Sequence, residues 1–326
     1  MGPAERSSTM FNATFVRPAA FYISGFSNMS HVKYFYFFLC FVYIMTVIGN
    51  VFLLVVICLV KSLHTPKFMI VCNLAFTDLC GSTALIPKVV DTFLFDRRYI
   101  VYEACLSYMF FVLFFTSVQS WTLVTMAFDR FIAICFPLRY HSIVTKTVIA
   151  VMLLFVWLFF LSEIAFMVGL IDRLSFCGSL DVQSFYCDHG PLSRLACNDR
   201  SLNSIVAYFV VVSINLIPLI LIAVTYICIS VALRRIASGE ERVRALKTCT
   251  AHLILVALFF LPFLGTNAAV IFSPVHPNAR IMNATLTHTI PPLLNPIVYS
   301  LKTEEVMKAI RKLCKRNRLM NTVRKK

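Results

Sequence analysis

Long apolar stretches constrain this chain more than any other feature. A helix needs about 20 mostly apolar residues to cross a lipid bilayer, and seven stretches meet that requirement. The whole chain is 59% hydrophobic and only 14% charged, which excludes an ordinary soluble domain. We therefore predict an all-α membrane protein, a bundle of seven transmembrane helices over residues 34–60, 66–90, 101–135, 143–168, 203–233, 245–272 and 282–301.

The distribution of basic residues predicts how the spans are oriented. With the N-terminus outside, 20 of the 30 Lys and Arg residues fall on the cytoplasmic side, as the positive-inside rule requires. Residues 1–33 are then an extracellular tail, residues 34–301 the bundle, and residues 302–326 a basic cytoplasmic tail with a short amphipathic helix after the seventh span. The net charge of +15 is interpreted as attraction to anionic membrane lipids, and no nucleic-acid partner is predicted.

Several sites of covalent modification follow from this orientation. The sequons that start at Asn12 and Asn28 lie in the extracellular tail and are predicted to be glycosylated. Four of the 12 cysteines lie outside the membrane, where disulfides persist, and they predict two bridges among three alternative pairings: Cys105, Cys177, Cys187 and Cys197. Cys314, in the basic tail, is a candidate for palmitoylation.

The motifs of common enzymes and nucleotide-binding proteins do not occur in the sequence. It has no P-loop, no dinucleotide-binding glycine motif, no nucleophile elbow and no zinc-ligand spacing of Cys and His. We therefore predict no catalytic residues, no cofactor and no metal centre.

A few polar residues fall within the predicted spans, where their burial is costly and function is the default explanation. Asp78 in the second span, with Asn50 and Asn295, forms a predicted polar cluster, either a structural network or a path for water or a small cation. The Asp129-Arg130 pair at the inner end of the third span suits an ion pair whose rearrangement exposes a cytoplasmic surface. An arginine that only extends its charged end to the membrane interface is the alternative. A transporter or channel that uses Asp78, Glu163 and His288 as a polar path is an alternative, although the spans show no internal repeat.

Over residues 49–306 the chain resembles the olfactory (odorant) receptors, a group within the rhodopsin-like G-protein-coupled receptors. The motifs that carry the resemblance are Gly49-Asn50, Leu63-His64-Thr65-Pro66, Asn73-Leu-Ala-Phe-Thr-Asp78-Leu, Met126-Ala-Phe-Asp129-Arg130-Phe-Ile-Ala-Ile-Cys135-Phe-Pro-Leu-Arg-Tyr140, Trp157, Phe185-Tyr-Cys187-Asp188, Lys247-Thr-Cys-Thr-Ala-His252 and Pro292-Leu-Leu-Asn295-Pro296-Ile-Val-Tyr299-Ser. The resemblance implies an odorant receptor that activates a stimulatory olfactory-type G protein and raises cyclic AMP. It also implies a multi-pass protein of the plasma membrane of olfactory sensory neurons. A receptor of the same family with a role outside olfaction is the alternative.

The resemblance further assigns roles to single residues. It implies the pairings Cys105–Cys187 and Cys177–Cys197. Activation and G-protein coupling are expected to use Asp129, Arg130, Tyr226, Asn295, Pro296 and Tyr299, and a polar network is expected at Asn50, Asp78 and Gln119. Gln119 stands where many relatives carry glutamate, so a sodium ion at Asp78 is left as an open alternative.

The ligand site is expected between the outer halves of the third, fifth, sixth and seventh spans. Helical spacing selects one face of each span, with Thr116, Asn267 and His288 as the expected hydrogen-bonding residues. The full set is Met109, Val112, Leu113, Thr116, Val210, Val211, Ile214, Phe260, Phe263, Asn267, Thr285 and His288. Because most of these side chains are apolar, we expect a small, partly apolar ligand.

Overall fold

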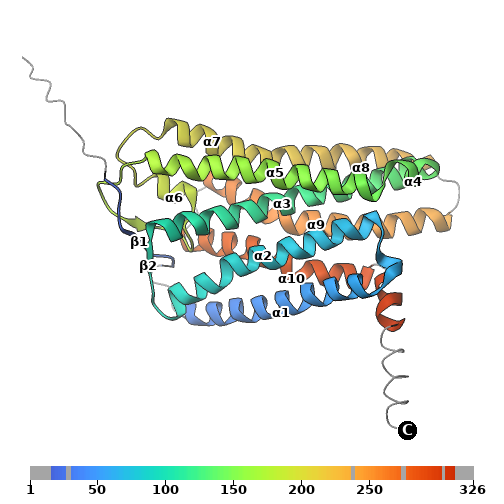
Figure 1. Cartoon of the computed structure of the whole chain (residues 1–326), viewed down its shortest axis with the longest axis horizontal. Coiled ribbons are helices and arrows are strands. Elements are labelled where there is room, and N and C mark those ends of the chain that lie inside the picture. Colours follow the sequence, from blue (N-terminus) through green and yellow to red (C-terminus); the bar gives the residue numbers. More distant parts are fainter. Residues whose placement is uncertain (1–15, 27–30, 236–238, 273–276, 303–304, 313–326) are drawn as a thin grey trace, which may run out of the picture.

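The computed structural model describes residues 16–26, 31–235, 239–272, 277–302 and 305–312, and in this part of the chain long helices run side by side as a bundle (Figure 1). They are α1 (Val32–Leu59), α2 (Pro66–Leu94), α3 (Tyr102–Cys135), α5 (Lys146–Gly169), α7 (Ser201–Val211) with α8 (Ile217–Arg235), α9 (Gly239–Phe272) and α10 (Pro277–Lys302). A π-helical turn, η4 (Val212–Leu216), joins α7 to α8 into one rod, so the bundle has the seven spans that the sequence predicts.

Five of the described helices meet both the length and the hydropathy expected of a membrane span. In α9 only Cys249–Gly265 forms a shorter apolar section, and α10 carries His288, Pro291, Pro292 and Pro296 among its apolar residues. Both helices also begin before the predicted boundaries of 245 and 282. Helical hydrogen bonding continues beyond the apolar section, which a hydropathy boundary does not detect.

Prolines inside the helices leave backbone carbonyls that neighbouring helices use. Pro296 has no N–H for the carbonyl of Pro292, and the Asn50 amide of α1 donates to that carbonyl at 3.0 Å. Pro218 likewise frees the carbonyl of Ile214, which accepts a hydrogen bond from the Ser120 hydroxyl of α3. These proline positions therefore bind adjacent helices to each other and do not simply break them.

A small sheet covers the extracellular end, which the all-α prediction did not include. Its strands are β1 (Ala20–Ile23), β2 (Tyr99–Val101) and β3 (Asp181–Val182), in the order β2-β1-β3. β1 pairs antiparallel with β2 and parallel with β3. Residues 20–23 of the predicted extracellular tail thus form a strand that pairs with two loops of the bundle.

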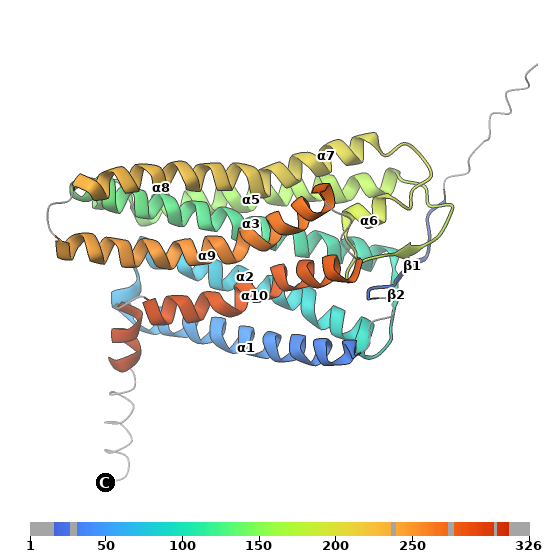
Figure 2. The same ribbon diagram turned by 180° about the vertical axis from the view of Figure 1, so that it is seen from behind.

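Short elements form the connections. They are η1 (Lys61–Leu63), η2 (Pro137–Arg139), α4 (Tyr140–Ile143), η3 (Leu170–Arg173) and α6 (His189–Ser193). A helix over residues 305–312 lies at the inner end of the bundle and points away from the direction of α10 (Figures 1 and 2). Val306 and Ala309 on one face of this helix are buried, as expected for the predicted amphipathic helix. Asn12, Asn28 and Cys314 lie outside the described residues.

Candidate ligand-binding and coupling sites

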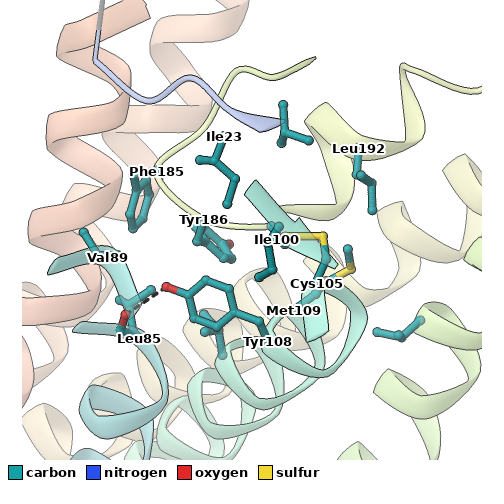
Figure 3. Close-up of a cluster of buried hydrophobic side chains, with 14 of the residues drawn as sticks. Ile23, Leu85, Val89, Ile100, Cys105, Tyr108, Met109, Phe185, Tyr186 and Leu192 are labelled. Carbon is teal, nitrogen blue, oxygen red and sulfur yellow. Dashed lines mark hydrogen bonds between the residues drawn. A yellow bond between two sulfur atoms is a disulfide. The ribbon is translucent and has the colours of Figure 1, made fainter. Parts of the chain in front are cut away.

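Two disulfides fix the long loop between α5 and α7. Cys105 at the start of α3 is bonded to Cys187, and Cys177 is bonded to Cys197, which confirms both predicted pairings. The first bridge fixes Phe185 and Tyr186 beneath the sheet, where they are only 2% and 4% exposed. Figure 3 shows both rings in the outer core with Ile23, Tyr108 and Met109.

The same loop buries titratable groups on the extracellular side. Burial lowers the pKa of His189 to about 4, because the charged imidazolium loses its hydration there. Burial also raises the pKa of Asp188, against hydrogen bonds from Tyr186 and from the backbone of His189 and Gly190 that act to lower it. The Nε2 atom of His189 has no hydrogen-bond partner in the described part of the chain. The loop between α5 and α7 is therefore densely packed over the extracellular end of the bundle.

Beneath Phe185 and Tyr186, two polar side chains from distant spans meet. Thr116 Oγ1 of α3 lies 3.3 Å from His288 Nδ1 of α10, and it also donates to the carbonyl of Val112 at 2.8 Å. The His288 ring lies 6.5 Å from the Phe185 ring and 6.1 Å from the Tyr186 ring, measured between centroids. A polar pair thus lies at the base of an aromatic lid.

A cavity of about 10 Å³ adjoins this pair, lined by Gly81, Leu85, Val112, Thr116, Gln119 and His288. That volume holds about one water molecule. Gly81 makes room here, because a Cβ at this position would lie in tight contact, 3.2 Å from the Phe115 Cβ and 3.3 Å from Gln119 Nε2. A larger ligand can therefore enter only if the side chains around the cavity, the lid included, move apart.

Other predicted ligand-binding residues of α3, α7 and α10 lie in or against the same outer region. Met109, Val112, Val210 and Ile214 are buried in the outer hydrophobic core, Leu113 packs against it, and Thr285 is buried in α10.

Two predicted ligand-binding residues lie elsewhere. Val211 is 42% exposed, because helical spacing puts Val210 and Ile214 on the buried face and turns Val211 away from it. Phe260 is packed in the inner core with Leu123 and Tyr299 and does not line the cavity. Phe263 is half-buried, and the side chain of Asn267 lies outside the described part of the chain.

In the region of the predicted polar network, α2 and α10 are joined by one buried hydrogen bond between side chains. Asn295 donates to Asp78 Oδ2 at 2.7 Å, and both side chains are buried. Gln119 donates to the carbonyl of Thr77 at 3.2 Å, whereas Asn50 bonds to backbone carbonyls and not to Asp78. Among the described residues, Asn50 Oδ1 and Ser82 Oγ are buried without a partner, and buried polar atoms of this kind commonly bind ordered water.

At the inner end of α3, Asp129 holds Arg130. The two side chains form an ion pair, and Tyr140 of α4 donates to Asp129 Oδ1 at 2.7 Å. Asp129 is buried, so its carboxylate is stabilised by both partners. The sequence indicated the ion pair, while the role of Tyr140 emerges only from the fold; its position at the end of the extended Asp-Arg motif was the available signal.

His252 of α9 contacts both α8 and α3, and these two contacts were not predicted from the sequence. Its Nδ1 lies 2.8 Å from the Tyr226 hydroxyl, and its Nε2 lies 3.0 Å from the Leu123 carbonyl. Because a carbonyl can only accept, the neutral tautomer that satisfies both contacts carries its proton on Nε2. A separate contact joins α10 to α3, where the Tyr299 hydroxyl lies 2.9 Å from the Met126 sulfur. The inner ends of α3, α8, α9 and α10 are thus held together.

The three ionisable residues of the alternative polar path bond to different partners. Asp78 accepts from Asn295, Glu163 accepts from Ser213 at 2.8 Å, and His288 pairs with Thr116. Glu163 therefore belongs to the contact between α5 and the π-helical turn. The described contacts do not link these residues into a continuous path.

Comparison with known proteins supports the resemblance inferred from the motifs. A profile described as "Olfactory receptor" matches residues 39–317. Human olfactory receptor 51I2 is 37% identical over 92% of this chain and 96% of its own length, and human olfactory receptor 51F2 is 34% identical over 94% and 90%. Rat olfactory receptor 1 is 32% identical over 89% of this chain and 93% of its own length. Squid rhodopsin has a similar fold, with a TM-score of 0.71 at 18% identity over 88% of this chain and 87% of its own.

Proposed function

The chain belongs to the olfactory receptor family, and on that premise we propose that it detects a small odorant and signals through a stimulatory olfactory-type G protein that raises cyclic AMP. Membership of this family makes it a multi-pass membrane receptor and not an enzyme. The proposal includes its site of action, the plasma membrane of olfactory sensory neurons.

The contact between Thr116 and His288 beneath the aromatic lid is the observation that carries the proposal. It offers a hydroxyl and an imidazole to a ligand in surroundings that are otherwise apolar, such as Leu85 and Val112. The described residues that line this cavity include no Asp, Glu, Lys or Arg, and an unpaired charge is costly to bury there. We therefore propose a neutral odorant with one hydrogen-bonding group, such as an alcohol, aldehyde or ketone.

Signalling in this proposal is a shift between a closed and an open state of the inner end. The ligand must bind the open state more tightly than the closed one, since only differential affinity moves the equilibrium. Opening separates α9 from α3 and α8, which breaks the contacts of His252 with Leu123 and Tyr226. Arg130 then leaves Asp129 and engages the G protein.

The test is cyclic AMP accumulation in cells that express the chain with a stimulatory olfactory-type G protein. A panel of small molecules matched in size compares neutral alcohols, aldehydes and ketones with carboxylic acids and amines. We expect a response to neutral members and its absence in a surface-expressed Arg130→Ala variant. We also expect a loss of potency of roughly 2- to 10-fold in His288→Leu, which corresponds to the about 0.5–1.5 kcal/mol of a buried hydrogen bond between neutral groups.

Val211→Ala is the matched control. Val211 belongs to the predicted ligand-binding set, but its side chain is exposed on the outside of α7. Equal potency losses in Val211→Ala and His288→Leu, or responses confined to charged molecules, contradict the proposed site. A ligand-dependent ion flux without a G protein supports the transporter or channel alternative instead.

A further inference from the structure

A second cavity, of about 570 Å³, lies at the cytoplasmic end of the bundle and shares no lining residue with the cavity at Thr116 and His288. It lies among the start of α2, the inner end of α3, the segment from α4 to the start of α5, and the helix over residues 305–312. Its lining residues are Ser62, Thr65, Pro66, Lys67, Phe68, Arg130, Tyr140, His141, Val144, Thr145 and Glu305. The volume is that of a small-molecule site.

Two long helices begin at this cavity. α2 starts at Pro66 without a side-chain cap, so the amides of its first turn are not bonded by the Thr65 side chain. α5 starts at Lys146, and its cap residue Thr145 also lines the cavity. The N-terminal end of each helix carries a partial positive charge, which favours an anion between them.

Cationic side chains add to the positive ends of the helices. Lys67 and Arg130 line the cavity from two different helices, and His141 lines it from α4. The hydroxyls of Ser62 and Thr65 supply further hydrogen-bonding groups around the same space. Together these groups provide positive charge and hydrogen-bond donors, and phosphate oxygens accept hydrogen bonds from such donors.

An anion of the protein itself already occupies part of this site. Both carboxylate oxygens of Glu305 lie near Lys67 Nζ, at 3.1 and 3.3 Å. Burial acts to raise the pKa of Glu305, but the charge and hydrogen bonds of Lys67 outweigh it, so the pKa lies below its ordinary value. The carboxylate is therefore ionised when it meets Lys67. Glu305 comes from the helix after α10, 238 positions away, so this ion pair also holds that helix to α2.

We propose that this cytoplasmic cavity binds a phosphomonoester anion, and that Glu305 is the intramolecular anion displaced by it. The phosphomonoester can come from a phosphoinositide headgroup of the inner leaflet or from a soluble inositol phosphate, which share this chemistry. Lys308 and Arg311 are exposed on the same short helix and attract either source. Binding releases Glu305 from Lys67 and places the phosphate beside Arg130, so the site is positioned to regulate coupling independently of the odorant.

The test measures dissociation constants for the full-length chain in phosphatidylcholine nanodiscs. The two probes are a short-chain phosphatidylinositol bisphosphate and inositol trisphosphate, with short-chain phosphatidylserine for comparison. We expect saturable binding of a phosphomonoester probe, at least about 10-fold weaker binding by Lys67→Gln, recovery in Lys67→Arg, and tighter binding by Glu305→Gln. Binding of both probes supports recognition of the headgroup alone, and binding of the lipid alone identifies the membrane as the source.

Lys61→Gln is the matched control, because Lys61 is exposed in the adjacent turn but does not line the cavity. Binding of neither probe overturns the proposal, as does equal affinity for phosphatidylserine. Equal weakening by Lys61→Gln and Lys67→Gln indicates a diffuse basic surface and also overturns it. If Lys67→Gln does not fold, Glu305→Gln decides the matter, since an unchanged dissociation constant in that variant excludes Glu305 as the displaced anion.

Discussion

Replacing His252 with phenylalanine tests how the inner end is held closed. The phenyl ring keeps the stacked packing on Tyr226, whose ring centroid lies 5.7 Å away at an interplanar angle of 6°. The substitution removes the contacts with the Tyr226 hydroxyl and with the Leu123 carbonyl. It therefore separates hydrogen bonding from ring packing at this position.

The expected magnitude follows from these two contacts. A buried hydrogen bond between neutral groups contributes about 0.5–1.5 kcal/mol, so losing both from the closed state costs about 1–3 kcal/mol. That free energy multiplies the ratio of open to closed receptors by roughly 5- to 150-fold. If the open form is about 1% of the population, it rises to about 5% or more.

The assay is basal cyclic AMP in cells with equal surface expression of the native chain and His252→Phe. We expect a basal rise that disappears when Arg130→Ala is added. Leu253→Ala, on the exposed face of the same helix, is expected to leave the basal signal unchanged. An unchanged basal signal in His252→Phe together with a lower unfolding temperature would refute the reasoning, because His252 would then stabilise both states equally.

Three further predictions concern the coupling end and the extracellular loop. Tyr140→Phe removes the hydrogen bond to Asp129, worth about 1.5–3 kcal/mol for a charged acceptor, and we expect a higher basal cyclic AMP signal; an unchanged signal contradicts this role. Replacing Cys177 and Cys197 together with serine opens a bridge that spans 20 positions and is expected to cost about 3 kcal/mol, measured as a lower unfolding temperature of the purified receptor. Burial lowers the pKa of His189 to about 4, so the unfolded loop binds the proton more readily than the folded one. Loop stability is therefore complete above about pH 6.5 and falls by up to about 3 kcal/mol as the pH drops towards 4, and a His189→Gln variant should show a flatter pH profile in hydrogen exchange.

The sequence predicts the arrangement of site residues only where helical spacing and local motifs carry the information. The face of α3 through Val112 and Thr116 follows from the helical repeat, and the Asp129–Arg130 pair joins adjacent residues. The same reasoning erred at Val211, where a one-residue shift turns the side chain to the exposed face. It also erred at Phe260, since periodicity gives the direction of a side chain but not its depth relative to other helices.

By itself the sequence determined the seven-helix bundle, because apolar length and the distribution of basic residues depend on composition along the chain and not on contacts. The resemblance supplied the disulfide pairing, which spacing had left open. Only the tertiary structure decided which distant groups meet: Thr116 with His288, His252 with Tyr226 and Leu123, and Lys67 with Glu305. These contacts join residues up to 238 positions apart, and their partners are set by how the helices pack, which no local pattern encodes.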